Sequence, residues 1–113
     1  MRRDWTYVDD VVAGIVAGTD RPLGYEVINL GRGEPILLAD FVRLIEDLAG
    51  REAHLTSAPM PEADVPYTYA NVDKARRLLG YDPQTSVSEG VRRFWEWYRG
   101  TVLGQDELKS WRP

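Results

Sequence analysis

The chain has 113 residues, which is enough for one domain but not for two. Hydrophobic residues make up 43% and charged residues 28%, a composition that is typical of globular proteins and unlike that of disordered chains. No apolar run approaches the roughly 20 residues needed to cross a bilayer, and a formal net charge of −4 argues against nucleic acid or an anionic membrane as a partner. The absence of cysteine excludes disulfides and thiol catalysis and, together with a polar N-terminal stretch, favours the cytoplasm.

The N-terminal part of the chain alternates between β-prone and helical patterns. A short β-prone run at 5–8 is followed by valines and an isoleucine at helical spacing, which predict a helix that ends at about Thr19. Asp9 or Asp10 is expected to cap this helix, because a carboxylate can accept from the free backbone N–H groups of the first turn. After a turn, the largely apolar segment 25–30 is predicted to be a strand.

The middle of the chain predicts a second helix, a weaker strand and a long loop. Apolar residues at helical spacing from Leu37 to Leu48 predict the helix, and Gly50 is placed as its C-cap. Residues 53–58 predict a third strand. Three prolines exclude regular structure at 59–66.

Two further helices are predicted near the C-terminus. Asn71 is placed to cap a short helix that Gly80 closes. Ser86 and Glu89 form the S-x-x-E pattern of a capping box before the last helix. The predicted fold class is therefore α/β, with about three short strands and four helices. A sheet of three strands is small for four helices, which indicates that the chain packs against something else.

The residue types offer little catalytic chemistry. His54 is the one histidine and has no cysteine to pair with, so a structural or exposed role is favoured over metal binding. Asp9 and Asp10 are explained by capping and the helix dipole. The Gly-Arg-Gly segment at 31–33 follows a predicted strand, as a phosphate loop would. It lacks the third glycine of G-x-G-x-x-G and is followed by Glu-Pro where a helix should begin, so a turn is the preferred interpretation.

Four motifs in order carry a family resemblance. They are Arg-Asp-Trp-Thr-Tyr-Val-Asp-Asp at 3–10, Asn-Leu-Gly at 29–31, Ala-Asp-Val-Pro at 63–66 and Asp-Lys-Ala-Arg-Arg-Leu-Leu-Gly-Tyr at 73–81. In this order and spacing they resemble the C-terminal third of an extended short-chain dehydrogenase/reductase of the NAD-dependent epimerase/dehydratase family, nearest to the UDP-glucuronate 4-epimerases. The resemblance implies a C-terminal fragment of that fold, with residues 1–100 as a nucleotide-sugar-binding domain and 101–113 as a tail.

The cofactor machinery of this family is missing from the sequence. In such enzymes the Rossmann domain carries the NAD loop and a Tyr-x-x-x-Lys pair whose tyrosine moves the proton. Here no glycine-rich fingerprint is found, and Tyr69 is followed by Lys74 five residues on rather than four. The resemblance therefore implies no complete Rossmann domain, no catalytic residue and no cofactor bound by this chain alone, although NAD serves the full-length family. We expect a truncated epimerase that is inactive by itself; the alternative is a non-catalytic binding or oligomerisation module derived from such an enzyme.

The resemblance does assign residues to the nucleotide half of a substrate site. Arg3 would lie beside the diphosphate or the ribose, because its planar cation suits phosphate oxygens. Trp5 would shape the nucleotide pocket, and Leu38 would pack against the uridine. Asp64 would accept hydrogen bonds from the ribose hydroxyls, with Thr68 on the same rim.

Three positions depart from the family pattern. Pro61 stands where many relatives carry an arginine or glutamine that reaches the diphosphate, Ala63 replaces a glycine, and Leu37 replaces a helix-capping serine. Loss of one of two phosphate-binding cations would cost about 1.5–3 kcal/mol, or roughly ten- to a hundredfold in affinity. Binding of a UDP-sugar by the chain alone is therefore expected to be weak or absent.

The resemblance also predicts association with other polypeptides. Surfaces that relatives bury against the Rossmann domain would be uncovered in this chain, and large apolar patches usually find a partner. We expect a homo-oligomer, with a symmetric dimer as the favoured form, or association with a Rossmann-domain partner. Met1 falls within a loop that is continuous in the family, which fits either a shortened gene or a cut made in the polypeptide.

Overall fold

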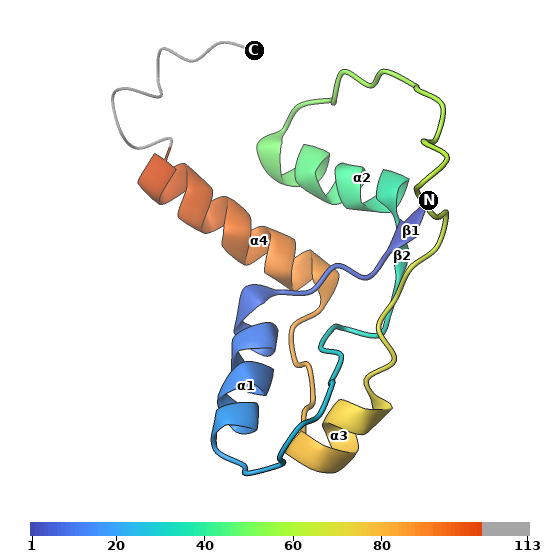
Figure 1. The fold of residues 1–113 in the computed structure, drawn as a ribbon. Coiled ribbons are helices and arrows are strands. Elements are labelled where there is room, and N and C mark those ends of the chain that lie inside the picture. Colours follow the sequence, from blue (N-terminus) through green and yellow to red (C-terminus); the bar gives the residue numbers. More distant parts are fainter. Residues whose placement is uncertain (103–113) are drawn as a thin grey trace.

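The computed structural model describes residues 1–102, which form four α-helices and a small two-stranded sheet (Figure 1). The strands are Arg2–Arg3 (β1) and Ile36–Leu37 (β2); the helices are Val8–Thr19 (α1), Leu38–Ala49 (α2), Asp73–Leu79 (α3) and Val87–Trp97 (α4), followed by a π-helical turn at Tyr98–Val102 (η1). The α/β class and the four predicted helices are confirmed. None of these helices is both long and apolar enough to span a bilayer. From residue 103 on, the predicted tail lies outside the described residues.

The small sheet brings three distant segments of the chain together. β1 pairs antiparallel with β2, so that Arg2 lies opposite Leu37. The other edge of β1 meets the end of the long loop. There the N–H of Arg2 donates to the carbonyl of Pro66 at 2.8 Å, and the N–H of Thr68 donates to the carbonyl of Arg2 at 3.3 Å. The N-terminal strand therefore lies between the start of α2 and the segment that precedes α3.

The strands predicted at 5–8, 25–30 and 53–58 are wrong, because within the described chain none of them pairs with another strand. Apolar and aromatic residues favour a strand only where a neighbouring strand and a buried face receive them. In 25–30, Ile28 packs against the core while Tyr25 is 91% exposed, so this segment is an extended connection over the core. Residues 53–58 are exposed throughout.

The buried core lies between α1 and α3. Its buried apolar residues, each at most 6% exposed, are Val72, Ala75, Leu79 and Tyr81. Partly buried residues packed against them include Ala17 of α1 and Leu30 of the connection that follows α1. The hydroxyl of Tyr81 donates to the carbonyl of Gly31 at 2.7 Å, which ties the core to the same connection.

Capping at α2, α3 and α4 largely follows the sequence prediction. Gly50 and Gly80 take φ angles of 66° and 64° after α2 and α3, the left-handed conformation that glycine adopts at no steric cost. At α3 the cap position is Val72, which makes no side-chain capping hydrogen bond, whereas Asn71, predicted as the cap, lies one residue earlier and accepts from the N–H of Asp73 at 3.0 Å. Ser86 caps α4, since its Oγ accepts from the N–H of Glu89 at 3.2 Å. The carboxylate of Glu89 pairs with arginines of its own helix, so only one half of the predicted capping box forms.

The start of α1 corrects the prediction for the two aspartates. The cap position is Tyr7, which makes no side-chain capping hydrogen bond. Asp9 is exposed, whereas the buried Asp10 accepts from the backbone N–H groups of Gln84 and Thr85, both at 3.0 Å. These N–H groups precede α4. The carboxylate of Asp10 therefore makes a tertiary contact and does not cap α1 as the local pattern predicted.

The helices form two groups, which Figure 1 shows at opposite ends of the molecule. α1 contacts α3 in one group, and α2 contacts α4 in the other. Trp5, in the segment that joins β1 to α1, stacks on Phe41 of α2 with ring centroids 3.9 Å apart. This stack attaches the α2–α4 group to the N-terminal segment and so positions the walls of the site described next.

Candidate functional site

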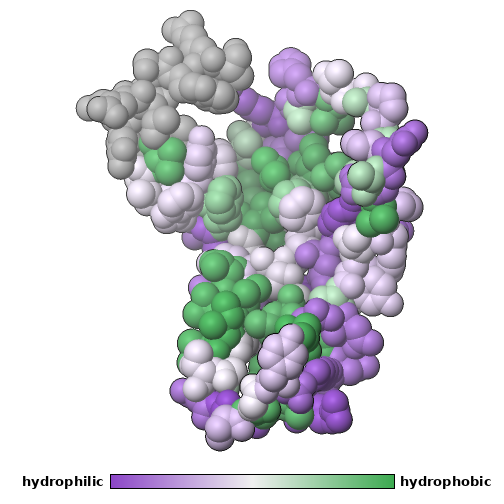
Figure 2. Space-filling view, viewed as in Figure 1, coloured by the Kyte–Doolittle hydropathy of each residue, from purple (hydrophilic) through white to green (hydrophobic). Residues whose placement is uncertain are grey.

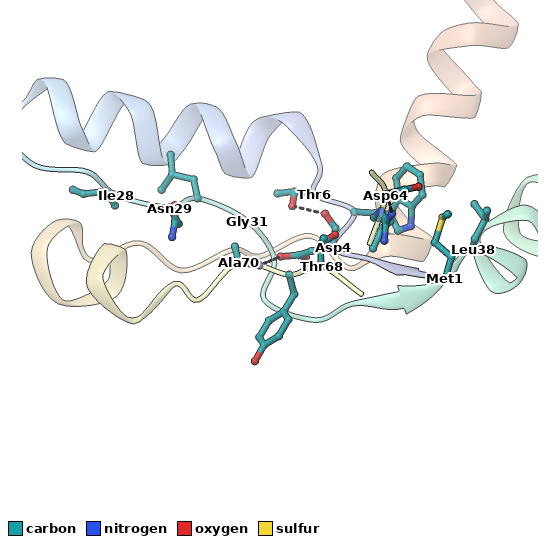
Figure 3. A pocket seen from close by; sticks show the side chains of 14 residues that line it. Met1, Asp4, Thr6, Ile28, Asn29, Gly31, Leu38, Asp64, Thr68 and Ala70 are labelled. Carbon is teal, nitrogen blue, oxygen red and sulfur yellow. Dashed lines mark hydrogen bonds and ion pairs between the residues drawn. The ribbon is translucent and has the colours of Figure 1, made fainter. Parts of the chain in front are cut away.

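An open cleft of about 870 Å³ lies where β1, the start of α2 and the segments around Gly31 and Thr68 meet (Figure 3). The five residues that the sequence assigned to a nucleotide site all line this cleft: Arg3, Trp5, Leu38, Asp64 and Thr68. They come from three parts of the chain, which are the N-terminal segment, the first turn of α2 and the stretch between α2 and α3.

The cleft also has lining residues that the sequence prediction missed. Asp4, Thr6, Asn29 and Tyr69 are among them. Figure 3 shows Asn29 at the opposite end of the cleft from Leu38, with Asp4 between them. Asp4, Thr6 and Asn29 belong to the motifs that carried the resemblance, so membership of those motifs was the available signal. Nothing comparable marked Tyr69.

Arg3 and Asp64 form an ion pair in the cleft. Nη2 of Arg3 donates to Oδ1 of Asp64 at 2.7 Å, and the two side chains are 22% and 36% exposed. The same carboxylate oxygen accepts from the N–H of Val65 at 2.8 Å, and Nη1 of Arg3 donates to the carbonyl of Arg2 at 2.9 Å. The cation and the carboxylate that the resemblance assigned to ligand binding therefore pair with each other.

A tight turn in the proline-rich loop places Asp64. The N–H of Asp64 donates to the carbonyl of Pro61 at 3.0 Å. The ring of Pro61 carries no hydrogen-bond donor. At the position where the resemblance expects a phosphate-binding side chain, this chain therefore contributes a backbone carbonyl to the turn.

Asp4 fixes one wall of the cleft by binding backbone from two segments. Its Oδ2 accepts from the N–H of Gly33 at 2.9 Å and from that of Ala70 at 3.0 Å. A Cβ on Gly31 would lie 2.6 Å from the Cβ of Ala70 and 2.7 Å from Oδ2 of Asp4, so close packing requires glycine there. The Gly-Arg-Gly segment is a packed turn, in agreement with the interpretation preferred from the sequence. The N–H of Arg32 donates to Oγ1 of Thr6 at 3.1 Å and that of Gly33 donates to Asp4, so neither is free to bind a phosphate.

Aromatic and apolar side chains form the end of the cleft near α2. The rings of Trp5 and Phe41 are nearly parallel, with 13° between their planes. The indole N–H of Trp5 is buried and has no hydrogen-bond partner within residues 1–102. Leu38, the first residue of α2, is 39% exposed. Such surfaces suit the face of a planar base.

The other candidate residues are placed away from any metal or acid–base arrangement. His54 lies in the exposed stretch after α2. Across residues 1–102, no group of three or more histidine, aspartate or glutamate side chains is arranged to hold a metal ion. Asp10 is engaged in the tertiary contact described above.

Comparison with known proteins gives relatives in both sequence and structure, although no protein-family model matches the chain. A UDP-glucuronate 4-epimerase of Thermodesulfobacterium geofontis is 39% identical over 101 residues, which cover 88% of this chain and 31% of that protein. The structure of an epimerase from Methanothermobacter thermautotrophicus matches with a TM-score of 0.82 at 35% identity, over 90% of this chain and 31% of that one. The UDP-glucuronic acid 4-epimerase of Bacillus cereus, in complex with UDP-glucuronic acid and NAD, matches with a TM-score of 0.73 at 31% identity, over 88% of this chain and 32% of that one.

In fold and in sequence, the chain matches the C-terminal part of NAD-dependent epimerases of the short-chain dehydrogenase/reductase family. Within that family, named relatives at 36–39% identity are UDP-glucuronate 4-epimerases, one of them described as probable. The resemblance inferred from the four motifs is confirmed. The chain spans about a third of the length of the curated relatives it matches.

Proposed function

We propose that residues 1–100 form the substrate-binding portion of an NAD-dependent nucleotide-sugar epimerase of the UDP-glucuronate 4-epimerase type. The main support is the convergence of the five assigned residues on one cleft, although Arg3 and Asp64 are 61 residues apart in the sequence. The cleft volume of about 870 Å³ falls within the usual range for small-molecule sites.

Each lining residue has a role in this proposal that its chemistry supports. Arg3 binds the diphosphate of a UDP-sugar, because a guanidinium can donate two parallel hydrogen bonds to phosphate oxygens. Asp64 accepts from the ribose hydroxyls. Trp5 and Leu38 cover the base, and the hydroxyl of Thr68 makes a polar contact at the rim. The ligand class follows that of the Bacillus cereus relative, which was solved with UDP-glucuronic acid.

The residues of this chain do not fit the NAD site that the family implies. The glycine-containing turn at 31–33 is packed against Asp4 and Ala70, and the sequence has no Tyr-x-x-x-Lys. We therefore assign no cofactor-binding and no catalytic residue to these 113 residues and expect them not to epimerise a sugar by themselves. An NAD-binding region would have to come from other polypeptide.

The exposed face of α1 offers a surface on which such a region could dock. Its apolar residues, which recur at helical spacing and are 48–60% exposed, are Val8, Val12, Ile15 and Val16. Figure 2 shows an apolar patch over this helix. Because contiguous exposed apolar patches mark interaction sites, we expect this face to contact a Rossmann-domain partner or, without one, a second copy of the chain.

A second candidate function is a non-catalytic binding or oligomerisation module that keeps the fold. It is favoured by Pro61, which supplies no side-chain donor for a diphosphate. The α1 patch serves this function as well as the first, because a module would also need a docking surface.

Titration of the 113-residue chain with UDP and UDP-glucuronate, followed by intrinsic tryptophan fluorescence, separates the two functions. Because Pro61 supplies no second donor for the diphosphate, we expect a weak but saturable change near millimolar ligand, which Arg3→Ala abolishes. Arg43→Ala is the matched control and should leave the change intact, because Arg43 also pairs with an aspartate but lies on the exposed side of α2. If the fluorescence of the parent chain does not change at millimolar ligand, the nucleotide-sugar site is wrong, and the non-catalytic module becomes the favoured function.

A further inference from the structure

We propose that Asp64 sets the preference of the cleft between the two halves of a nucleotide, by favouring ribose hydroxyls and opposing the diphosphate. This inference rests on the proposed function, since it concerns the same cleft. It starts from the ion pair between Nη2 of Arg3 and Oδ1 of Asp64 at 2.7 Å. In that pair the carboxylate offsets the cation on which a phosphate would depend.

The other acidic side chain in the cleft adds to the repulsion between Asp64 and a bound diphosphate. The acidic and basic side chains among the lining residues are one guanidinium, Arg3, and two carboxyl groups, Asp4 and Asp64; Met1, which carries the N-terminal amine, lines the cleft as well. A diphosphate that approaches Arg3 therefore meets two like charges and must share the guanidinium with one of them. At the reduced dielectric of a partly buried site, such repulsion is stronger than in water.

The carboxylate of Asp64 is held in place from its own backbone. Oδ1 accepts from the N–H of Val65 at 2.8 Å, and the N–H of Asp64 itself donates to Pro61 at 3.0 Å. Rotation of the Asp64 side chain away from Arg3 would therefore break its hydrogen bond with Val65. Its Oδ2 makes no hydrogen bond within residues 1–102, so it remains available to accept from uncharged hydroxyls while Oδ1 keeps Arg3 occupied.

Asp64→Asn tests this inference, because the amide keeps an acceptor for Val65 and removes the charge. Asp40→Asn is the matched control: it removes the same charge from an Arg–Asp pair, Arg43 and Asp40 at 3.1 Å, that does not line the cleft. Binding of inorganic pyrophosphate, uridine and UDP is measured by calorimetry on each full chain, with circular dichroism to confirm folding.

The expected result is opposite changes for the two small ligands. Asp64→Asn should bind pyrophosphate roughly three- to tenfold more tightly than the parent, and uridine more weakly by a similar factor. Asp40→Asn should change neither. Adding Arg3→Ala to Asp64→Asn should remove the gain for pyrophosphate, because the gain depends on the released guanidinium.

The outcomes separate this inference from the proposed function. If the parent binds UDP but Asp64→Asn does not strengthen pyrophosphate binding, or does so no more than Asp40→Asn, the inference is wrong and the nucleotide site stands. If the parent binds no UDP at millimolar concentration, the proposed function fails. In that case a gain of pyrophosphate binding in Asp64→Asn still supports the inference, and no gain overturns it.

Discussion

The carboxylate of Asp10 accepts a hydrogen bond from the N–H of Thr85, 75 residues further along the chain, at 3.0 Å. Its other oxygen accepts from the N–H of Gln84, also at 3.0 Å. Asp10 is 6% exposed, and both N–H groups precede α4. One buried side chain therefore joins α1 to the start of α4, and so joins the two groups of helices.

Asp10→Ala is expected to lower the free energy of unfolding by about 2–4 kcal/mol, because two backbone donors near a buried position lose a charged acceptor. Urea denaturation followed by circular dichroism measures the change. Asp9→Ala is the control, since Asp9 is the exposed neighbour in the same helical turn; it should stay within about 0.5 kcal/mol of the parent. Equal losses in the two variants would show that Asp10 acts through the helix dipole and not through Thr85.

Gly31→Ala is expected to destabilise the fold by about 1–3 kcal/mol, because the added Cβ would overlap Ala70 and Asp4 and neither can move far. Gly18→Ala is the control: at Gly18 a Cβ meets nothing within 4 Å, and alanine in a helix should stabilise by about 0.5–1 kcal/mol. Thermal unfolding of both variants gives the comparison. A Gly31→Ala variant as stable as the parent would show that Ala70 and Asp4 can shift enough to accommodate the added Cβ.

The helices and most of their caps could be predicted because the information is local. The apolar stripe of α2, the Ser86 cap and the glycines after α2 and α3 each involve residues within a few positions of one another. The strands could not be predicted in this way. Arg2 pairs with Leu37 and bridges to Tyr67, and the segments involved do not coincide with the β-prone runs.

In the candidate site, too, some features could be predicted from the sequence, whereas those that depend on contacts between distant segments could not. The motif resemblance selected residues that the fold brings together, since motifs record positions in a known architecture. The pairing of Arg3 with Asp64 was not foreseen, because it depends on the path of the proline-rich loop. The role of Asp10 was also missed, because a carboxylate at a helix start has a local explanation that competes with the distant one.

The stability contributed by Glu89 should depend on pH. Hydrogen bonds from Arg92 and then from Arg93 lower the pKa of the Glu89 carboxyl from 4.5 to about 2. A carboxyl with a lowered pKa in the folded state adds stability that is present above its unfolded pKa and is lost as pH falls through the folded one. The parent should therefore lose stability between pH 4.5 and about 2 relative to Glu89→Gln.

Denaturant unfolding of the parent and Glu89→Gln at neutral pH and through this acid window measures the difference. The effect will be small, because the network is exposed to solvent. Glu62→Gln, in the exposed loop, is the control for general loss of a carboxylate. A constant difference between parent and Glu89→Gln across the window would contradict the role of the two arginines.

Tyr81→Phe is expected to lower the free energy of unfolding by about 0.5–1.5 kcal/mol at neutral pH, since the carbonyl of Gly31 loses its donor. Burial raises the pKa of the Tyr81 phenol above 10.0, so the folded state favours the neutral form. The stability that the neutral Tyr81 phenol adds to the folded state is fully present below the pKa of the unfolded state, and it is lost as pH rises through the raised pKa of the folded state. The difference in unfolding free energy between the parent and Tyr81→Phe should therefore become smaller in alkaline solution. Chemical denaturation at neutral and at alkaline pH measures it. Tyr25→Phe, at a residue that is 91% exposed, is the control and should show no such trend. A Tyr81→Phe variant as stable as the parent at every pH would show that the hydrogen bond from Tyr81 to Gly31 does not stabilise the fold.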